Sequence, residues 1–496
     1  MKTARFEVLS GEEVERIHAA SMEILAEVGI KVNYKKARDI FREAGAEINE
    51  ETLAVKLPEK LVRWAVDQAP SRFSLYGIDA NFRLDIGPDQ AESVFAGLGT
   101  PTRIIDLENG SVRAATKQDM IDHIILINAC KNIHNSQMDV WPDDISMTTI
   151  HTEAIYAWAH NSRKPYGMGC YGYLPTWDMM RMMAIAVGGK QELKQRPRFF
   201  AICSVVSPLQ MDQAQAEGLL ICAEYGQPVT CAPEAIAGTT APVTLAGLVA
   251  QENAAILAHI TLAQVFRPGT PVLYGTVSTT ANMRYGTVTL GSPETGLITA
   301  ASAQMARYYG LPIRSVGGAT DSKREDLQAG FERMGTLLPA VLAGVNLITC
   351  AGTLDSTMLE SHALLMLDDE ICGAALRMAR GIEVNEQSLA LDLIKGVGFS
   401  GNYITAKETN RLFREELFIP TMFSREPYEA WEKEGSKLAI DHARERALEV
   451  LTRHTPHEVD PEVEKELDAF RQMVATRDLQ DFYLYETEER QDLEAL

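Results

Sequence analysis

The stretch IRSVGGATDSKREDLQAGFERMGTLLPAVLAGVNLITCA, residues 313–351, contains the pattern that decides the fold. It begins with a short run of apolar and small residues, Ile313–Gly317, which is typical of a buried strand. A loop rich in Gly, Asp and Ser follows, and then apolar residues recur at helical spacing over Arg324–Leu342. A second strand-like run, Asn346–Ala351, completes the unit. The order of strand, loop, helix and strand predicts parallel strands joined by helices.

The same unit repeats eight times over about 280 residues, from Ser93 to about Leu376. Its strand-like runs are rich in β-branched or small residues and occupy 93–97, 134–139, 166–170, 199–204, 229–232, 272–276, 313–317 and 346–351. Its helical patterns occupy 118–130, 148–160, 179–187, 212–224, 245–266, 294–309, 324–342 and 359–377. Eight such units predict a (β/α)8 TIM barrel, which is an α/β fold. A doubly wound open sheet is the alternative, but no GxGxxG motif opens a helix after the first strand.

Two further parts flank the predicted barrel, which we assign to residues 91–380. Residues 1–90 alternate short helical and extended patterns, which predicts an N-terminal α+β cap. After Gly381 the pattern becomes helical and highly charged, so residues 381–496 are predicted to form a helical C-terminal extension. The acidic tail at 486–496 is expected to be frayed, because it can bury little apolar surface.

The composition excludes several classes of partner. The 496 residues carry a net charge of −21, which argues against nucleic acid and against anionic membrane surfaces. The N-terminus has no apolar segment of signal-peptide length, and no uninterrupted apolar run reaches about 18 residues, so a cytoplasmic protein is expected. Seven scattered cysteines without a CxxC pair indicate neither a disulfide framework nor a zinc ribbon.

Familiar catalytic motifs are also missing from the sequence. It contains no GxxxxGK[ST] phosphate loop and no GxSxG elbow, and its histidines form no HxH, HExxH or His-plus-carboxylate pair recognised at ligand spacing. We therefore predict no directly bound metal ion. In a TIM barrel the reactive groups come from the carboxyl ends of the strands and from the loops that follow them. Here those positions are aromatic, Gly-rich and mostly uncharged, which favours an apolar or cationic small ligand.

The candidate site residues lie at or near these strand ends. They are Trp141, Tyr171, Tyr173, Glu234, Tyr274, Arg314, Asp321, Asp355, Ser356 and His362. A structural role is the alternative for several of them. The Trp141 ring could plug the barrel top, Glu234 and Asp355 could order loops, and His362 could be a buried structural histidine. Tyr171 and Tyr173 alternate on a segment predicted to be extended, so at most one of them should face the pocket.

Several longer motifs resemble the trimethylamine methyltransferase family. They are Gly317–Lys323 with Asp326, Gln328–Gly330 and Glu332, then Val345–Ile348, Ala351–Asp355, Asp368–Glu370, Gly401–Tyr403 with Thr409, and upstream Gly291–Glu294 and Tyr308–Pro312. The similarity extends from about residue 10 to about residue 450. It implies a TIM-barrel enzyme that moves a methyl group from a methylated amine to a corrinoid (cobalamin) held by a cognate corrinoid-binding protein.

The chain departs from this family at one informative place. The resemblance implies that members using trimethylamine carry pyrrolysine near the loop after the last strand. Here the corresponding stretch, Gly352–His362, holds only standard residues, with Ser356 or a neighbour at the aligned position. The chain therefore resembles the pyrrolysine-free branch, whose members demethylate quaternary amines. Glycine betaine is the substrate that we expect, and proline betaine, carnitine or butyrobetaine is the alternative. An alternative function is that of a non-catalytic barrel that binds quaternary amines.

Quaternary amines also make chemical sense for such a site. A quaternary nitrogen already carries its positive charge and leaves as a neutral tertiary amine, so no metal, covalent nucleophile or obligatory general acid is needed. We expect Trp141, Tyr171, Tyr173 and Tyr274 to form an aromatic cage around it, each contact contributing ~1–2 kcal/mol. Glu234 and Asp321 are further substrate-binding candidates. Loop N–H groups or an arginine, Arg314 or Arg284, are expected to bind a betaine carboxylate, and the alternative for Arg314 is that it points into the outer helix layer. Asp355, Ser356 and His362 are the predicted catalytic positions.

The predicted partners follow from the family and not from the charge. A corrinoid-binding protein must dock over the barrel mouth, so the corrinoid belongs to the partner and the substrate is a small quaternary amine. Neither nucleic acid nor a membrane is expected as a partner. Helix faces in the C-terminal extension lead us to expect a homo-oligomer.

Overall fold

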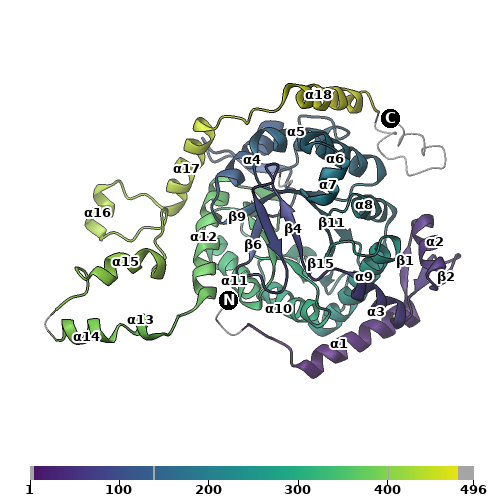
Figure 1. Ribbon diagram of the computed structural model, residues 1–496, viewed down its shortest axis with the longest axis horizontal. Coiled ribbons are helices and arrows are strands. Elements are labelled where there is room, and N and C mark those ends of the chain that lie inside the picture. The colour runs from purple at the N-terminus through teal and green to yellow at the C-terminus, as the bar shows by residue number, and fades with distance from the viewer. Residues whose placement is uncertain (1–4, 138–139, 400, 479–496) are drawn as a thin grey trace.

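The structure is a computed structural model that describes residues 5–137, 140–399 and 401–478. Eight parallel strands close into a barrel, and helices form a ring around it (Figure 1). In chain order the barrel strands are β6 (Val94–Gly97), β9 (Ile133–Gln137), β10 (Tyr166–Gly169), β11 (Phe199–Val205), β13 (Val229–Pro233), β15 (Val272–Thr276), β18 (Ile313–Val316) and β19 (Leu347–Ala351). The predicted (β/α)8 fold is confirmed. Asp139, at the end of the second predicted strand, lies outside the described residues.

The outer ring follows the eight predicted helices closely, but it has an additional short helix over 190–195, and one helix begins earlier than predicted. Its members are α4 (Lys117–Ala129), α5 (Ile150–Asn161), α6 (Tyr173–Val187), α7 (Lys190–Gln195), α8 (Gln213–Glu224), α9 (Leu245–Phe266), α10 (Pro293–Tyr308), α11 (Leu327–Ala343) and α12 (His362–Arg380). Helix α6 begins at Tyr173 and not at Met179. Gly172, at φ 92°, provides the turn into the helix, and Pro175 is tolerated because it lies in the first turn.

The amino end of the barrel is closed by an apolar plug. The hairpin of β4 (Phe73–Tyr76) and β5 (Arg83–Ile86) packs its buried side chains against residues that point into the barrel. The plug consists of Leu75, Leu84 and Ile86 from the hairpin with Val94, Ala96, Phe200, Leu273 and Leu347 from the barrel strands. This end of the barrel is therefore filled and dry.

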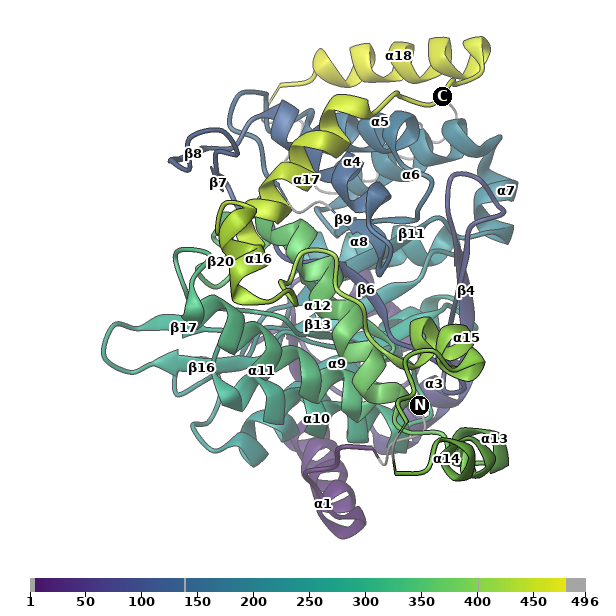
Figure 2. The ribbon, with the colours of Figure 1, turned by 90° about the vertical axis from the view of Figure 1, so that its left-hand side faces the viewer.

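The opposite, carboxyl end carries short strands inserted into the loops. They are β7 (Arg103–Ile105), β8 (Val112–Ala114), β14 (Ile236–Ala237), β16 (Thr279–Asn282), β17 (Thr287–Thr289), β20 (Thr353–Leu354) and β21 (Leu359–Glu360). Figure 2 shows β7, β17 and β20 on one side of the molecule and β4 on the other. The two ends of the barrel are thus built differently.

The chain before β4 forms a small mixed layer against the barrel helices. It contains α1 (Gly11–Glu23), η1 (Ile24–Val28), β1 (Ile30–Val32), α2 (Lys35–Glu43), β2 (Glu47–Asn49), β3 (Ala54–Lys56) and α3 (Glu59–Gln68). Strand β1 pairs with β3 and, in parallel, with β12 (Gln210–Met211) from a barrel loop. Both α1 and α3 pack on α9. By length and composition α9 could cross a membrane, but 78% of its apolar window is buried here, as in a core helix.

After α12 the chain is helical within the described residues. The helices are α13 (Glu386–Leu389), α14 (Leu391–Val397), α15 (Lys407–Glu416), α16 (Tyr428–Lys433), α17 (Ala439–Arg453) and α18 (Pro461–Ala475). Helix α17 packs on α12 and α4, and α18 packs on α5 and α6, so this segment returns to the barrel at its end. The boundaries at residues 90 and 380 stay predictions, and the tail at 486–496 lies outside the described residues.

Candidate active site

Pairing between neighbouring strands identifies the side chains that share the barrel interior. Arg314 on β18 pairs with Leu347, a plug residue that points inward, so Arg314 also points inward. On β11, Ser204 lies four residues after the inward Phe200 and therefore also points inward. Ala232 on β13 pairs with Ser204, so Ala232 points inward as well. Side chains alternate along a strand, so the next inward position on the β13 side is Glu234. Glu234, just past the carboxyl end of β13, and Arg314 on β18 therefore both face the barrel interior.

The environment of Glu234 perturbs its ionisation. Its side chain is solvent-accessible. Desolvation by the surrounding protein nevertheless raises its pKa, and the positive charge of nearby Arg314 lowers that pKa. Arg314 itself is only 3% exposed. The loop after β13 is held by the backbone N–H of Ala235, which donates to Ser278 Oγ at 3.0 Å. The barrel mouth thus holds one accessible carboxylate beside one buried guanidinium.

An aromatic pair lies at the ends of β9 and β10. The Trp141 and Tyr171 rings meet edge to face, with centroids 5.7 Å apart and planes at 74°. The Tyr171 ring folds over Gly169, where an added Cβ would lie 2.8 Å from ring carbons. Both rings are half-buried, and the backbone N–H of Trp141 donates to the Pro101 carbonyl at 2.9 Å. Such edge-to-face pairs present ring faces and edges to a ligand in a fixed geometry.

Ser356 and Asp321 connect three loops at the carboxyl end. The Ser356 hydroxyl lies 2.5 Å from Asp321 Oδ1 and 3.1 Å from the Val288 carbonyl oxygen. The same Asp321 oxygen accepts the Gly291 N–H at 3.1 Å, and the Asp321 N–H donates to Glu332 at 2.8 Å. These bonds hold the loop after β19 against the loop after β18 and the end of the β16–β17 hairpin.

The turn that carries Ser356 is strained. Asp355, Ser356 and Thr357 have φ values of 51°, 50° and 74°, a left-handed conformation that costs L-residues roughly 1–2 kcal/mol each. Gly99 allows the close approach of this turn, since a Cβ there would lie 2.6 Å from Thr357 Cβ. Asp355 points to the rim, where it pairs with Lys323 Nζ at 3.0 Å, both side chains being well exposed. Strain of this kind is found where a loop must hold a defined shape.

Comparison with known proteins identifies the family. A family model described as trimethylamine methyltransferase (MTTB) matches residues 1–478. The chain belongs to the trimethylamine methyltransferase family. The resemblance seen in the sequence motifs is confirmed.

Individual relatives cover almost the whole chain. A glycine betaine methyltransferase of Desulfitobacterium hafniense (strain Y51) is 37% identical over 469 residues, which is 94% of this chain and 96% of the relative. A trimethylamine methyltransferase MttB of Methanosarcina barkeri is 34% identical over 464 residues, covering 92% and 93%. The crystal structure of the monomethylamine methyltransferase MtmB of Methanosarcina barkeri aligns at 14% identity with a TM-score of 0.48, covering 90% and 96%.

Two predicted cage residues of this methyltransferase do not line the mouth. Tyr274 points outward from β15, where its hydroxyl donates to Asn253 on α9 at 3.1 Å and its ring stacks near Tyr309. Tyr173 is the first residue of α6, so the extended segment predicted for it is wrong. It borders an outer cavity of about 200 Å³ with residues of α2, α6 and α8. Neither tyrosine joins the Trp141–Tyr171 pair.

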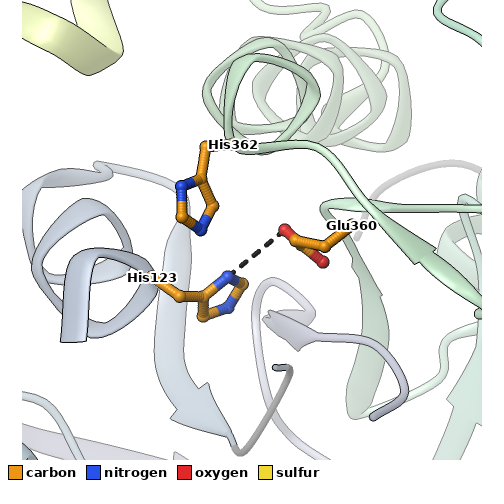
Figure 3. A group of neighbouring side chains, drawn as sticks. All are labelled: His123, Glu360 and His362. Carbon is orange, nitrogen blue, oxygen red and sulfur yellow. Dashed lines mark ion pairs between the residues drawn. The ribbon is translucent and has the colours of Figure 1, made fainter. Parts of the chain in front are cut away.

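His362 belongs to a buried cluster of side chains. It begins α12 and is buried with His123 of α4 and Glu360 of β21, as Figure 3 shows. Burial and the neighbouring His123 lower the pKa of His362 to about 3, so its imidazole is neutral at pH 7. Sequence reasoning missed His123 and Glu360, although Glu360 and His362 stand only two residues apart in the sequence. That spacing at the end of a strand was the available signal.

A larger cavity lies far from this chemistry. It measures about 870 Å³ and borders Ser93 and Asn346, at the starts of β6 and β19, together with Arg380 and Glu416. Functional groups of TIM barrels gather at the other, carboxyl end of the strands. Size alone therefore does not mark the candidate site. Arg284, the alternative carboxylate ligand, stacks on Tyr285 in the turn of the β16–β17 hairpin.

Proposed function

We propose that this methyltransferase transfers a methyl group from a quaternary amine to a corrinoid carried by a partner protein. Glycine betaine is the substrate best supported, which would make dimethylglycine the product. The support is the 37% identity to a relative named glycine betaine methyltransferase, together with a loop after β19 that holds only standard residues. The nitrogen keeps the electron pair of the broken C–N bond. The corrinoid supplies a cobalt(I) nucleophile that accepts the methyl group.

The observation that carries this proposal is the Trp141–Tyr171 pair at the carboxyl end of the barrel. An ammonium held against desolvated aromatic faces gains ~2 kcal/mol. The positive charge on nitrogen falls as the C–N bond breaks, so a strong ion pair at that atom would hold the substrate more tightly than the transition state. Aromatic faces bind the cation with a smaller preference for the substrate over the transition state.

The charged pair in the mouth suits a zwitterionic substrate. Arg314 offers a buried guanidinium for the carboxylate of a betaine, as Arg does in many carboxylate sites. Glu234 offers negative charge to the ammonium end, and Arg314 moderates that charge from close by. This arrangement favours a betaine over trimethylamine, which has no carboxylate. Proline betaine and carnitine share both charges and remain the alternative substrates.

The partner would approach over the carboxyl end of the barrel. The apolar plug fills the amino end, so a corrinoid held by another protein fits only the side where the loops and the mouth lie. Asp321 and Ser356 would shape the loop along this side, and Asp355 would stand on its rim. Direct action of Asp355 or Ser356 on the substrate stays a prediction, as do a homo-oligomer and a cytoplasmic location.

A methyl-transfer assay with chemically reduced cobalamin tests the proposal. The enzyme is mixed with cob(I)alamin and each of glycine betaine, proline betaine, carnitine, butyrobetaine and trimethylamine, and methylcobalamin is followed by absorbance. We expect the fastest conversion with glycine betaine and a rate near the enzyme-free control with trimethylamine. Faster conversion of another betaine would select that substrate. Demethylation of trimethylamine without that of any quaternary amine would overturn the proposal, and binding without conversion would favour the non-catalytic barrel.

A further inference from the structure

His123 of α4, Glu360 of β21 and His362 of α12 form a compact buried cluster (Figure 3). One nitrogen of each imidazole and one carboxylate oxygen all lie within 4.8 Å of one another. The three residues are 1%, 0% and 2% exposed. We propose that this cluster binds a divalent transition-metal ion, with Zn²⁺ the best fit.

The spacing of the donor atoms fits a shared ion. His123 Nδ1 lies 3.3 Å from Glu360 Oε1. Two atoms bound to one tetrahedral zinc ion at 2.0–2.1 Å are separated by about 3.3 Å. His362 Nε2 is buried and has no hydrogen-bond partner among the described residues. A small inward movement of His362 would bring its nitrogen to bonding distance.

The donor set favours zinc over larger or harder ions. Two imidazole nitrogens and one carboxylate oxygen, with a fourth position for water, are the ligands of many zinc sites. Within the described parts of the chain, no fourth His, Cys, Asp or Glu joins this group. An octahedral ion would need three further ligands, whereas tetrahedral zinc needs one.

An ion here would hold the loop after the last barrel strand. Its ligands come from α4, β21 and α12, and β21 pairs with β20 in the hairpin that encloses the strained turn at Asp355–Thr357. Gly352 makes room for the Glu360 carboxylate, because a Cβ at this position would collide with it. The ion would therefore fix the hairpin that presents Ser356. This role is structural and does not depend on which amine is the substrate.

Metal analysis of the untagged, full-length protein tests this inference. We expect about one equivalent of zinc by elemental analysis after expression in zinc-supplemented medium. After removal with a chelator, titration with Co²⁺ should give saturable visible d–d absorption at the same stoichiometry. The variants Glu360→Gln and His123→Asn should bind at least about 100-fold more weakly, because each removes a ligand.

The matched control is His259→Asn. His259 is another fully buried histidine, and its Nδ1 is paired with the Ala255 carbonyl within α9. This variant should bind Zn²⁺ and Co²⁺ as the wild type does. The inference is overturned if folded wild-type protein contains only traces of metal and shows no saturable binding of either ion. It is equally overturned if Glu360→Gln binds as tightly as the wild type. These readouts are independent of methyl transfer, so they separate this inference from the proposed function.

Discussion

The two ends of one barrel strand in this enzyme face different surroundings. On β11, Phe200 points into the dry plug at the amino end, whereas Ser204, four residues later, is exposed at the carboxyl end. On β18 the inward Arg314 pairs in register with plug residue Leu347, and its positive charge lowers the pKa of Glu234 against the effect of desolvation. The amino end therefore stabilises the barrel through apolar packing. The carboxyl end carries polar groups, as expected where a TIM barrel has its active site. Substitutions at the two ends should separate stability from activity.

The largest expected effect is on stability, from Phe200→Ala at the amino end. Truncating a fully buried Phe leaves a cavity and lowers the free energy of unfolding by about 3–5 kcal/mol. Urea denaturation measures the change. Ser204→Ala on the same strand should change it by less than about 1 kcal/mol. Equal losses from both variants would contradict the division between the two ends.

The next effect is on activity, from Glu234→Gln at the carboxyl end. Loss of the carboxylate beside Arg314 should lower kcat/KM by about 100-fold, or ~2.8 kcal/mol. Folding should be spared, because the raised pKa of Glu234 means that its ionisation opposes folding. The variant should therefore be as stable as the wild type at acid pH and slightly more stable at neutral pH.

The pH dependence of the rate provides the control for this variant. In the wild type, activity should fall as the pH drops through a value above the usual glutamate pKa, because protonation removes the charge of Glu234. This acidic limb should be absent in Glu234→Gln. An unchanged pH–rate profile would exclude Glu234 from the site.

A smaller effect is expected from Trp141→Ala in the aromatic pair. The apparent Kd for the quaternary amine should rise about 10-fold, which corresponds to one lost cation–π contact of ~1.4 kcal/mol. Isothermal titration calorimetry measures it. Trp141→Phe keeps an aromatic face and should lose less affinity. If Trp141→Ala binds as the wild type does, the ring only plugs the barrel top.

The smallest effect is expected from Ser356→Ala in the strained turn. Loss of the hydroxyl that contacts Asp321 should cost about 1 kcal/mol of stability, with faster hydrogen exchange over 352–361. Ser356→Gly loses the same hydroxyl but relieves the left-handed strain at φ 50°, so it should be the more stable of the two variants. The reverse order would show that the strain is negligible.

Much of the architecture could be predicted because its signals are local. Each of the eight predicted strands overlaps a barrel strand, and helix α9 has the predicted bounds of Leu245–Phe266. Thr116 and Asp119, three residues apart, form a capping box at the start of α4. Each side chain accepts a hydrogen bond from the backbone N–H of the other residue. The prediction for Tyr173 is wrong because Gly172 and Pro175 mark the start of a helix. Hydrophobic periodicity alone does not find such a start.

By itself, the sequence determined the strand–helix rhythm, the family and the residues available at the strand ends, because periodicity and motifs are properties of neighbouring positions. Only the tertiary structure decided which of those residues meet. Tyr274 faces α9 while Arg314 faces the interior, since the face that a strand turns inward depends on its pairing in the closed sheet. His123 joins Glu360 and His362 because β19 pairs with β6 and closes the ring, which places the last helix of the barrel beside the first.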